Sequence, residues 1–198
     1  YPSVCMFHGS NYTKLRLRNL LSPWDAWYAV GNKVYSFWEG YVLRNSDLCF
    51  FNSNYTKEML LRDYKLRDNA RFVVSYLGIN TARFESLSYK REIFLHKYGV
   101  NRDEKIVTYV AGLVAHKRHS LLVNLVPDIL RVFPKVKFLL VGRDIGELSS
   151  VVKLINKLGV KDKIILRGEV PREEIPEVYF FTDIYVHVSS NETFSYSI

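Results

Sequence analysis

Residues 106–141 read IVTYVAGLVAHKRHSLLVNLVPDILRVFPKVKFLLV, and this stretch decides the fold. A short apolar run at Ile106–Ala111 is typical of a buried strand, and a second such run follows at Val136–Val141. Between the two runs, His119–Val132 carries apolar residues at helical spacing. A strand, a helix and a strand in this order predict a βαβ unit, in which the two strands are parallel.

The same alternation continues toward the end of the chain. Apolar runs predict further strands at Lys163–Leu166 and Ile184–Val188, and helical spacing predicts helices at Leu148–Leu158 and Glu173–Phe181. Strands that alternate with helices in this way form a parallel sheet with helices on its faces. We therefore predict an α/β domain with a Rossmann-like parallel sheet over residues 103–198.

The N-terminal part of the chain has a similar but less regular pattern. Its apolar runs predict three strands, at Ser3–Phe7, Leu48–Phe51 and Phe72–Leu77. Ser53 is placed to cap a helix, and we predict a second Rossmann-like domain over residues 1–85. Residues 86–102, with a helix-like piece at Tyr89–Tyr98, are predicted to connect the two domains. Both chain ends interrupt the pattern, so we expect each domain to be only partly present.

An aromatic stripe runs along residues 24–45. Aromatic and apolar side chains recur there at spacings of three and four residues, which is typical of a helix. Two interpretations stay open at this point. The stripe either packs into a core, or it contacts lipid or a protein partner.

The composition describes a folded protein of basic charge. Apolar residues make up 48% of the chain, which is enough for a core and disfavours disorder. The net charge of +8 is divided evenly: residues 1–85 hold 11 Lys and Arg against 7 Asp and Glu, and residues 86–198 hold 17 against 13. An anionic partner such as a phosphate or an acidic lipid is expected. Nucleic acid is not, because the charge is not clustered on one element.

The cysteines and the hydropathy indicate the cellular compartment and the relation to membranes. Cys5 and Cys49 each lie in an apolar run, so we expect two buried free thiols and not a disulfide or metal site. No run of about 18 apolar residues is present, so no membrane span is expected. We expect a cytoplasmic protein that associates peripherally with the inner membrane face.

The loop after the first strand of the C-terminal domain carries positive charge. Ala111–His119 leaves a predicted strand and enters a predicted helix, with Lys117 and Arg118 near its end. We expect free backbone N–H groups, the helix dipole and the two cations to form a diphosphate site. The alternative is an ordinary solvated basic turn. His116 and His119 stand three residues apart, but no third ligand accompanies them, so no metal is expected.

A carboxylate follows the last predicted strand. Ser189–Tyr196 is predicted to begin a helix there, with Glu192 beside the same crevice as the basic loop. Because a carboxylate accepts hydrogen bonds from paired hydroxyls, Glu192 indicates a hydroxyl-rich partner such as a sugar. The alternative is a first-turn residue stabilised by the helix dipole. The glycine fingerprints of dinucleotide and P-loop sites are absent, and Gly142–Gly146 is predicted to be a tight turn.

Six segments carry a further signal when they are taken in order. They are Ser46–Lys57, Val73–Phe84, Tyr109–Lys117, Phe138–Gly142, Leu166–Val170 and Thr182–Glu192. Together they resemble glycosyltransferase family 4, a retaining group of the GT-B fold that includes glycogen and sucrose synthases and many lipid and polysaccharide mannosyltransferases. The resemblance spans nearly the whole chain, and it implies a GT-B fold made of two Rossmann-like domains.

The resemblance implies roles for individual residues. Lys117, with Arg118 beside it, matches the lysine that binds the donor diphosphate, and Glu192 matches the first of two paired glutamates, which contacts the transferred sugar. His8 matches a histidine near the reacting carbon, so His8 and Glu192 are expected to face one cleft. Val170 matches a backbone contact to the nucleobase. Three residues match positions whose backbone amides approach the sugar and phosphate: Thr193, Phe194 and Ser195.

The chain also departs from the family pattern. Gly112, in the donor-binding loop, stands where the family commonly has an arginine, so diphosphate binding would depend more on Lys117. Thr193 and Ser195 replace glycines, so the backbone is expected to approach the ligand less closely. The second glutamate of the family motif would fall beyond Ile198.

The implied activity is that of a retaining hexosyltransferase that needs neither metal nor cofactor. It would move a sugar from a nucleotide diphosphate sugar to a glycan, lipid or small-molecule acceptor. The 198-residue chain alone is expected to be inactive, because most acceptor contacts of the family lie outside it. Two alternatives remain open: a GT-B nucleotide-sugar epimerase and a non-catalytic nucleotide-sugar binding module.

Overall fold

The chain folds into two compact units, seen in a computed structural model that describes residues 2–7, 23–85 and 90–195. Unit 1 comprises Tyr1–Gly78 together with Thr193–Tyr196, and unit 2 comprises Ile79–Glu192 together with Ser197–Ile198. Each unit has its own parallel sheet and its own buried apolar core.

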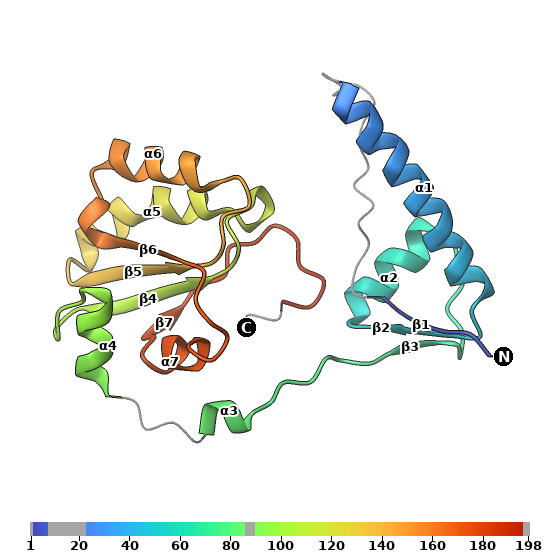
Figure 1. Ribbon diagram of the computed structural model, residues 1–198, viewed down its shortest axis with the longest axis horizontal. Coiled ribbons are helices and arrows are strands. Elements are labelled where there is room, and N and C mark those ends of the chain that lie inside the picture. Colours follow the sequence, from blue (N-terminus) through green and yellow to red (C-terminus); the bar gives the residue numbers. More distant parts are fainter. Residues whose placement is uncertain (1, 8–22, 86–89, 196–198) are drawn as a thin grey trace. The chain divides into compact units, whose positions relative to one another are not determined.

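Unit 2 is built on a four-stranded parallel sheet (Figure 1). Its strands are β4 (Lys105–Val110), β5 (Val136–Val141), β6 (Ile164–Gly168) and β7 (Ile184–Tyr185). They lie in the order β6-β5-β4-β7, and every neighbouring pair is parallel. Parallel neighbours require crossover connections, which helices provide here, so the predicted alternation of strands and helices is confirmed.

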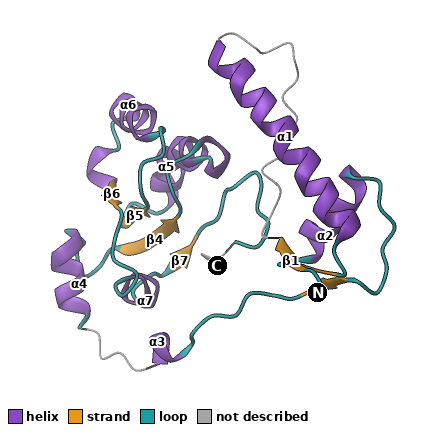
Figure 2. Ribbon diagram, turned by 45° about the vertical axis from the view of Figure 1, so that its right-hand side comes forward, coloured by secondary structure: helices purple, strands orange, loops and turns teal. Residues whose placement is uncertain are grey.

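Helices cover both faces of this sheet (Figures 1 and 2). They are α4 (Arg91–Tyr98), α5 (His119–Val132), α6 (Leu148–Leu158) and α7 (Ile175–Phe180), preceded by the short α3 (Ala82–Glu85). Tyr109 and Phe138 pack with α5 and α6, whereas Ile106 and Leu139 pack with α4 and α7. Because alternate strand residues face opposite helix layers, both must be apolar, which explains the continuous apolar runs.

Unit 1 has a three-stranded parallel sheet with helices packed on one face. Its elements are β1 (Val4–Phe7), α1 (Pro23–Asn45), β2 (Leu48–Phe51), α2 (Asn54–Asp63) and β3 (Phe72–Val74). Phe51 lies at the centre of the core, with its ring stacked on Phe7 at 5.5 Å and edge-on to Phe72 at 6.0 Å. Leu43 of α1 and Leu60 of α2 close over these rings.

The predicted helices of unit 1 are confirmed. The aromatic stripe of residues 24–45 lies on α1, and Ser53 caps α2 by accepting the N–H of Thr56 at 3.1 Å. Among the described helices, none is both long and apolar enough to cross a bilayer. Cys5 and Cys49 are free thiols that lie opposite each other on β1 and β2. Burial, reinforced by the neighbouring Cys5, raises the pKa of Cys49 to about 12.

Two predicted strands are shorter than expected. Strand β3 ends at Val74 and not at Leu77, because the N–H of Ser75 bonds to Phe51, the last residue of its partner β2. Strand β7 ends at Tyr185 and not at Val188. It is an edge strand that pairs only with β4 among the described strands, and Val186 donates the last backbone bond to Thr108.

The prediction of a helix starting at Ser189 is wrong for the described residues, which reach Ser195. The N–H of Ser190 donates to the carbonyl oxygen of His116 at 2.8 Å, which holds this segment against the neighbouring turn. Ser195 has φ = 44°, a left-handed conformation that does not continue a right-handed helix.

Gly142 lets two loops meet at the carboxyl edge of the sheet of unit 2. A Cβ atom at this position would lie 1.9 Å from the carbonyl oxygen of Ala111, far inside van der Waals contact. The segment that was predicted to be a tight turn, Gly142–Gly146, therefore begins with a close backbone contact between Gly142, after β5, and Ala111, after β4. Any side chain at position 142 would push the loop after β5 away from the loop after β4.

We predict that Gly142→Ala lowers the free energy of unfolding of unit 2 by about 2 kcal/mol or more, because the added methyl clashes with rigid backbone. Chemical denaturation followed by circular dichroism measures this change. Gly31→Ala in α1 is the matched control, because nothing lies within 4 Å of the position that a Cβ atom would take there. The control should leave stability unchanged or slightly raised, and an equal loss in both variants would contradict the packing explanation.

Candidate functional site

The loops that follow β4 and β7 meet at the carboxyl edge of the sheet in unit 2. The first forms a single 3₁₀ turn, Ala115–Lys117, and the second runs from Ser189 to Glu192. The carbonyl oxygen of His116 joins the two loops. It accepts the N–H of Ser190 at 2.8 Å and hydroxyl hydrogens from Ser190 and Ser189 at 3.1 and 3.2 Å.

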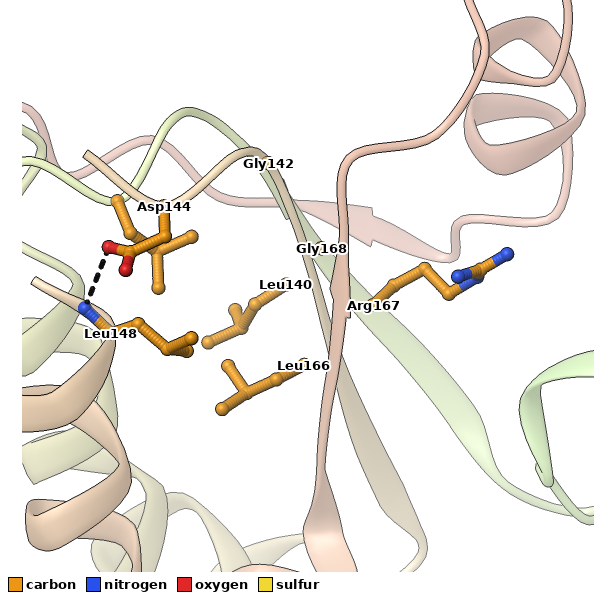
Figure 3. Close-up of a pocket in the computed structure, with 8 residues that line it drawn as sticks. Leu140, Gly142, Asp144, Leu148, Leu166, Arg167 and Gly168 are labelled. Atoms are coloured by element: carbon orange, nitrogen blue, oxygen red, sulfur yellow. Dashed lines mark hydrogen bonds between the residues drawn. The ribbon is translucent and has the colours of Figure 1, made fainter. Parts of the chain in front are cut away.

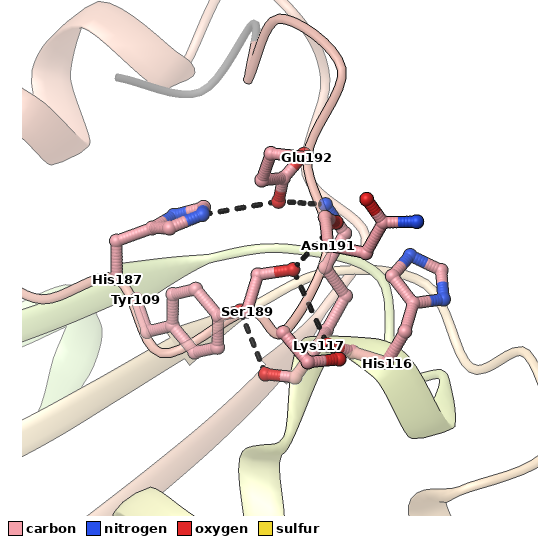
Figure 4. A network of polar contacts seen from close by, with 8 residues as sticks. Tyr109, His116, Lys117, His187, Ser189, Asn191 and Glu192 are labelled. Carbon is pink, nitrogen blue, oxygen red and sulfur yellow. Dashed lines mark hydrogen bonds and ion pairs between the residues drawn. The ribbon is translucent and has the colours of Figure 1, made fainter. Parts of the chain in front are cut away.

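This junction brings Lys117 and Glu192 together, 75 positions apart in the sequence (192 − 117). Lys117 Nζ forms an ion pair with Glu192 Oε1, and His187 Nε2 lies 3.0 Å from the same oxygen (Figure 4). The three side chains are largely buried, with exposed fractions of 19%, 24% and 18%. Glu192 is thus held between a lysine and a histidine.

The electrostatics favour an ionised Glu192. Burial raises the pKa of this carboxyl, but the hydrogen bond and charge of Lys117 outweigh burial, so that the pKa lies below its ordinary value. Near neutral pH Glu192 is therefore a carboxylate. An ion pair at this depth gives up solvation on both sides, so its net contribution to stability is small.

Tyr109 of β4 supports the turn from below (Figure 4). This side chain is fully buried, and its hydroxyl donates to the carbonyl oxygen of Lys117 at 2.8 Å. Burial raises the pKa of Tyr109 well above its ordinary value, so the phenol stays protonated as a donor. Its ring also lies 4.8 Å from His119 and 5.8 Å from His187. Tyr109 therefore fixes the backbone that carries Lys117.

Some of the N–H groups in Ala111–His119 that were expected to be free already have acceptors. Leu113 donates to Arg143, Val114 to Gly112, Lys117 to Val114 and Arg118 to Ala115. These bonds close parts of the loop into tight turns, so these four donors are already used. Arg118 is exposed and has φ = 52°. An anion at this edge would depend on side chains and on the N-terminus of α5, and less on the loop backbone.

The N-terminus of α6 is likewise already occupied. Asp144 Oδ1 accepts the N–H groups of Gly146, Glu147 and Leu148 at 2.9 to 3.1 Å. These hydrogen bonds, first that of Leu148, hold the pKa of Asp144 below its ordinary value. A second anion near these amides would be repelled by the aspartate.

Gly112 lies against the same loop. A Cβ atom at Gly112 would come within 2.9 Å of Cδ1 of Ile145, so a longer side chain here requires Ile145 to move. Because Cδ1 is the far end of a side chain that is 51% exposed, Ile145 can move aside, and the contact does not by itself require glycine at position 112. The role of Gly112 in donor binding stays a prediction.

A pocket of about 200 Å³ lies beyond the carboxyl ends of β5 and β6 (Figure 3). Its lining comprises Leu113, Leu140, Gly142, Asp144, Leu148, Leu166, Arg167 and Gly168. The three leucines at 140, 148 and 166 point toward one another, whereas the Arg167 side chain points to the other side of β6 (Figure 3). The pocket is smaller than the roughly 300 Å³ at which small-molecule sites begin, so it has room for part of a ligand at most.

The other predicted site residues lie in different environments. Val170 is buried among α4, α7 and the sheet, which leaves its backbone as the only group for the predicted nucleobase contact. Thr193, Phe194 and Ser195 group with unit 1, where the Thr193 carbonyl accepts from Ser53 and Phe194 lies near Tyr76. His8 lies outside the described residues. The roles of these residues stay predictions.

The two histidines of the basic loop do not share a site. His119 is 2% exposed and stacks on Tyr109, whereas His116 is exposed. Among the described residues, no group of three His, Cys, Asp or Glu side chains is placed to hold a metal ion. Two residues of the cluster were missed by sequence reasoning, namely His187 and Tyr109. Both lie inside apolar strand patterns, where their contribution to core packing hides any other role.

Comparisons with known proteins identify the family of this chain. The family model for glycosyl transferases group 1 matches residues 90–198, which include Lys117, His187 and Glu192. The chain belongs to the glycosyl transferases group 1 family. The expectation that the chain is related to glycosyltransferases is therefore confirmed.

Curated relatives of this group 1 chain include two enzymes of lipid glycosylation. One is a GDP-mannose-dependent alpha-(1-6)-phosphatidylinositol monomannoside mannosyltransferase of Mycolicibacterium smegmatis, 25% identical over 108 residues, which are 54% of this chain and 28% of the relative. Another is the phosphatidylinositol N-acetylglucosaminyltransferase GPI3 subunit of Saccharomyces cerevisiae, 25% identical over 176 residues, which are 89% of this chain and 36% of the relative. The chain thus spans about a third of their length.

Solved structures confirm the fold class. WaaG, a glycosyltransferase involved in lipopolysaccharide biosynthesis, superposes with a TM-score of 0.73 at 18% identity. The superposed region comprises 96% of this chain and 51% of the WaaG chain. Anabaena Alr3699/HepE in complex with UDP-glucose gives 0.72 at 20% identity, covering 97% and 48%. Both are GT-B proteins, so the prediction of an α/β GT-B fold with two Rossmann-like sheets is confirmed.

His119 makes the stability of this group 1 chain depend on pH. Burial lowers the pKa of His119 to about 4, so the folded state keeps this imidazole neutral while the unfolded chain protonates near 6.5. Below the unfolded value the unfolded state binds more protons, so stability falls as pH drops from 6.5 toward 4. We predict a total loss of roughly 3 kcal/mol from this group.

Urea denaturation at a series of pH values measures that loss. In His119→Leu the slope between pH 6.5 and 4 should flatten, because the titrating group is gone. His96→Gln, which changes an exposed histidine of α4, should keep the slope of the unmodified chain. A slope that is unchanged in His119→Leu would assign the pH dependence to other groups.

Proposed function

We propose that this chain is the central part of a retaining glycosyltransferase of family 4 that uses a nucleotide diphosphate sugar. The observation that carries the proposal is the Lys117–Glu192 ion pair. It sets a cation and a carboxylate side by side at the carboxyl edge of a parallel sheet, within the residues that match the family. A diphosphate needs the first group and a sugar the second.

In this proposal, Lys117 exchanges partners when the donor arrives. The diphosphate carries more negative charge than Glu192, so Lys117 turns from the carboxylate to the phosphate and stabilises the charge that develops as the diphosphate leaves. His187 stays beside Glu192, which therefore does not become an isolated buried charge. Glu192 is then free to accept hydrogen bonds from sugar hydroxyls and to orient the sugar.

The names of similar proteins support the choice of substrates. One relative is named for GDP-mannose, and one structural neighbour was solved with UDP-glucose. Two relatives are named for phosphatidylinositol or its mannoside. We propose a hexose donor linked to a nucleoside diphosphate and a lipid or glycan acceptor, with catalysis that needs no metal and takes place at the cytoplasmic face of a membrane.

The test uses the natural full-length protein that contains this chain, incubated with a panel of UDP- and GDP-hexoses and a lipid extract. Release of nucleoside diphosphate with glycosylated lipid, and retained anomeric configuration by NMR, is the expected result. Epimerised sugar without transfer would favour an epimerase, and binding without turnover a binding module. Robust turnover by the 198-residue chain alone would contradict the expected dependence on acceptor contacts outside it.

We predict that Lys117→Ala weakens binding of a nucleoside diphosphate by roughly 1.5–3 kcal/mol, because a charge-assisted contact to phosphate is lost. Binding of the bare nucleoside should change little. Isothermal titration calorimetry with both ligands measures the difference. Lys153→Ala, an exposed lysine of α6, is the matched control and should bind as the unmodified protein does. Equal weakening of both ligands would remove Lys117 from the phosphate site.

Glu192→Gln should change the binding of two ligands to different extents. The change frees Lys117 from its ion pair, so a nucleoside diphosphate should bind more tightly, by up to about 1 kcal/mol. The nucleotide sugar should bind more weakly relative to that diphosphate, because glutamine is a poorer acceptor for sugar hydroxyls. Calorimetry with the two ligands measures both effects. A change of the same sign and size for both would mean that Glu192 does not contact the sugar.

A further inference from the structure

Helix α1 of unit 1 turns a row of large apolar side chains toward solvent. The row, here called the outer stripe, consists of Val34, Phe37, Trp38 and Tyr41, with exposed fractions of 53%, 67%, 57% and 51%. Their spacing of three and four residues places them on one face of the helix. Phe37 and Tyr41 each make an edge-to-face contact with the Trp38 ring at 5.8 Å, so the stripe is continuous.

The opposite face of α1 is already in use. Leu43 is fully buried in the core of unit 1, and the Tyr64 ring packs so close to Gly40 that a Cβ there would lie 2.8 Å from it. Tyr64 also donates its hydroxyl hydrogen to Glu39 at 2.6 Å and lies 3.1 Å from the Ser36 hydroxyl. These contacts fix the rotation of α1, so the helix cannot bury the outer stripe by turning.

Of the two sequence-based interpretations of the aromatic stripe, core packing therefore fails for its described, outward-facing residues. A contiguous exposed apolar row on a folded unit marks an interaction surface. Tryptophan and tyrosine are the side chains that favour the boundary between lipid headgroups and acyl chains, because their rings are apolar and their tips polar. The residue types of the outer stripe thus fit a lipid interface better than a purely apolar core.

The charge around the outer stripe agrees with a lipid partner. Lys33 is exposed on α1 near the stripe, whereas the guanidinium of Arg44 donates to the carbonyl oxygens of Gly40 and Tyr64 at 3.1 Å each, on the inner face. Within residues 31–45 the one acidic side chain is Glu39, and it is 5% exposed and bound to Tyr64 on the inner face. The solvent-facing side of this part of α1 therefore carries the Lys33 ammonium and no carboxylate, which suits the negative surface of a membrane that contains anionic lipid.

We infer that the outer stripe docks unit 1 on the surface of a bilayer that contains anionic lipid, with α1 lying along the interface and its aromatic side chains inserted among the headgroups. The helix does not cross the bilayer; it binds by burying aromatic area and by attraction between the Lys33 ammonium and acidic headgroups. Membrane binding by the outer stripe does not depend on the proposed function. Only its purpose does, which would be to bring the enzyme to a lipid acceptor.

The chain contains its own reporter for this contact. All three tryptophans, Trp24, Trp27 and Trp38, belong to α1. In the double variant Trp24→Phe/Trp27→Phe, fluorescence comes from the outer stripe alone. On mixing with phosphatidylcholine vesicles that contain phosphatidylserine, we expect a blue shift of this emission, quenching by brominated acyl chains and co-sedimentation. The chain should bind pure phosphatidylcholine vesicles more weakly. High salt should reduce the difference in affinity between the anionic and the neutral vesicles, because it screens the charges.

Variants separate the aromatic from the electrostatic contribution. Phe37→Ser/Tyr41→Ser should reduce partitioning to anionic vesicles by about tenfold or more, because two inserted rings are lost. Lys33→Glu should weaken binding to anionic vesicles and leave binding to neutral ones unchanged. Phe133→Ser is the matched control, because Phe133 is equally exposed, at 63%, but lies in unit 2. It should bind vesicles as the unmodified chain does, and circular dichroism checks that all variants fold.

Three results would overturn the inference: no spectral shift with any vesicle, an equal loss in Phe133→Ser, or self-association through the stripe without vesicle binding. The last would show a second copy of the chain as the occupant. Vesicle binding is measured without donor or acceptor, so it is independent of sugar transfer. Binding without transfer would contradict the proposed function alone, and transfer to a lipid acceptor without binding would contradict this inference alone.

Discussion

A single backbone atom, the carbonyl oxygen of His116, holds the candidate site together. It accepts one N–H and two hydroxyl hydrogens from Ser189 and Ser190, and so it ties the segment after the edge strand β7 to the turn after β4. Without this junction, Glu192 would follow a two-residue strand with little else to restrain it. The ion pair with Lys117 and the contact with His187 both depend on a position that the junction defines.

Most of the fold could be predicted from the sequence because the central strands of unit 2, β4 and β5, are buried on both faces. Burial on both faces requires continuous apolar runs such as Ile106–Ala111. Because a helix lies between two such runs, the strands are expected to be parallel. Strand ends were harder to predict, because they are decided by the partner strand. Phe72–Leu77 is mostly apolar, yet its ladder ends where β2 ends.

Several residues of the candidate site were predicted from the sequence, but the hydrogen bonds and the ion pair that join them were not. Lys117 and Glu192 were identified by residue type and by their places after strands, whereas their mutual pairing depends on a bond to a backbone carbonyl that any residue could supply. The backbone N–H groups of the basic loop were expected to be free, but short turns use several of them. His187 was hidden because a histidine within an apolar strand looks like a packing residue until its neighbours in space are known.

The placement of every tryptophan on α1 has a consequence for how folding of this molecule is observed. Because α1 belongs to unit 1, tryptophan emission reports on that unit, and unit 2 contributes no tryptophan of its own. Two compact units need not melt together, and a single transition temperature is defined only when they do. A melting curve recorded by intrinsic fluorescence therefore describes one half of the molecule, and calorimetry or far-ultraviolet dichroism is needed to register the half that carries Lys117 and Glu192.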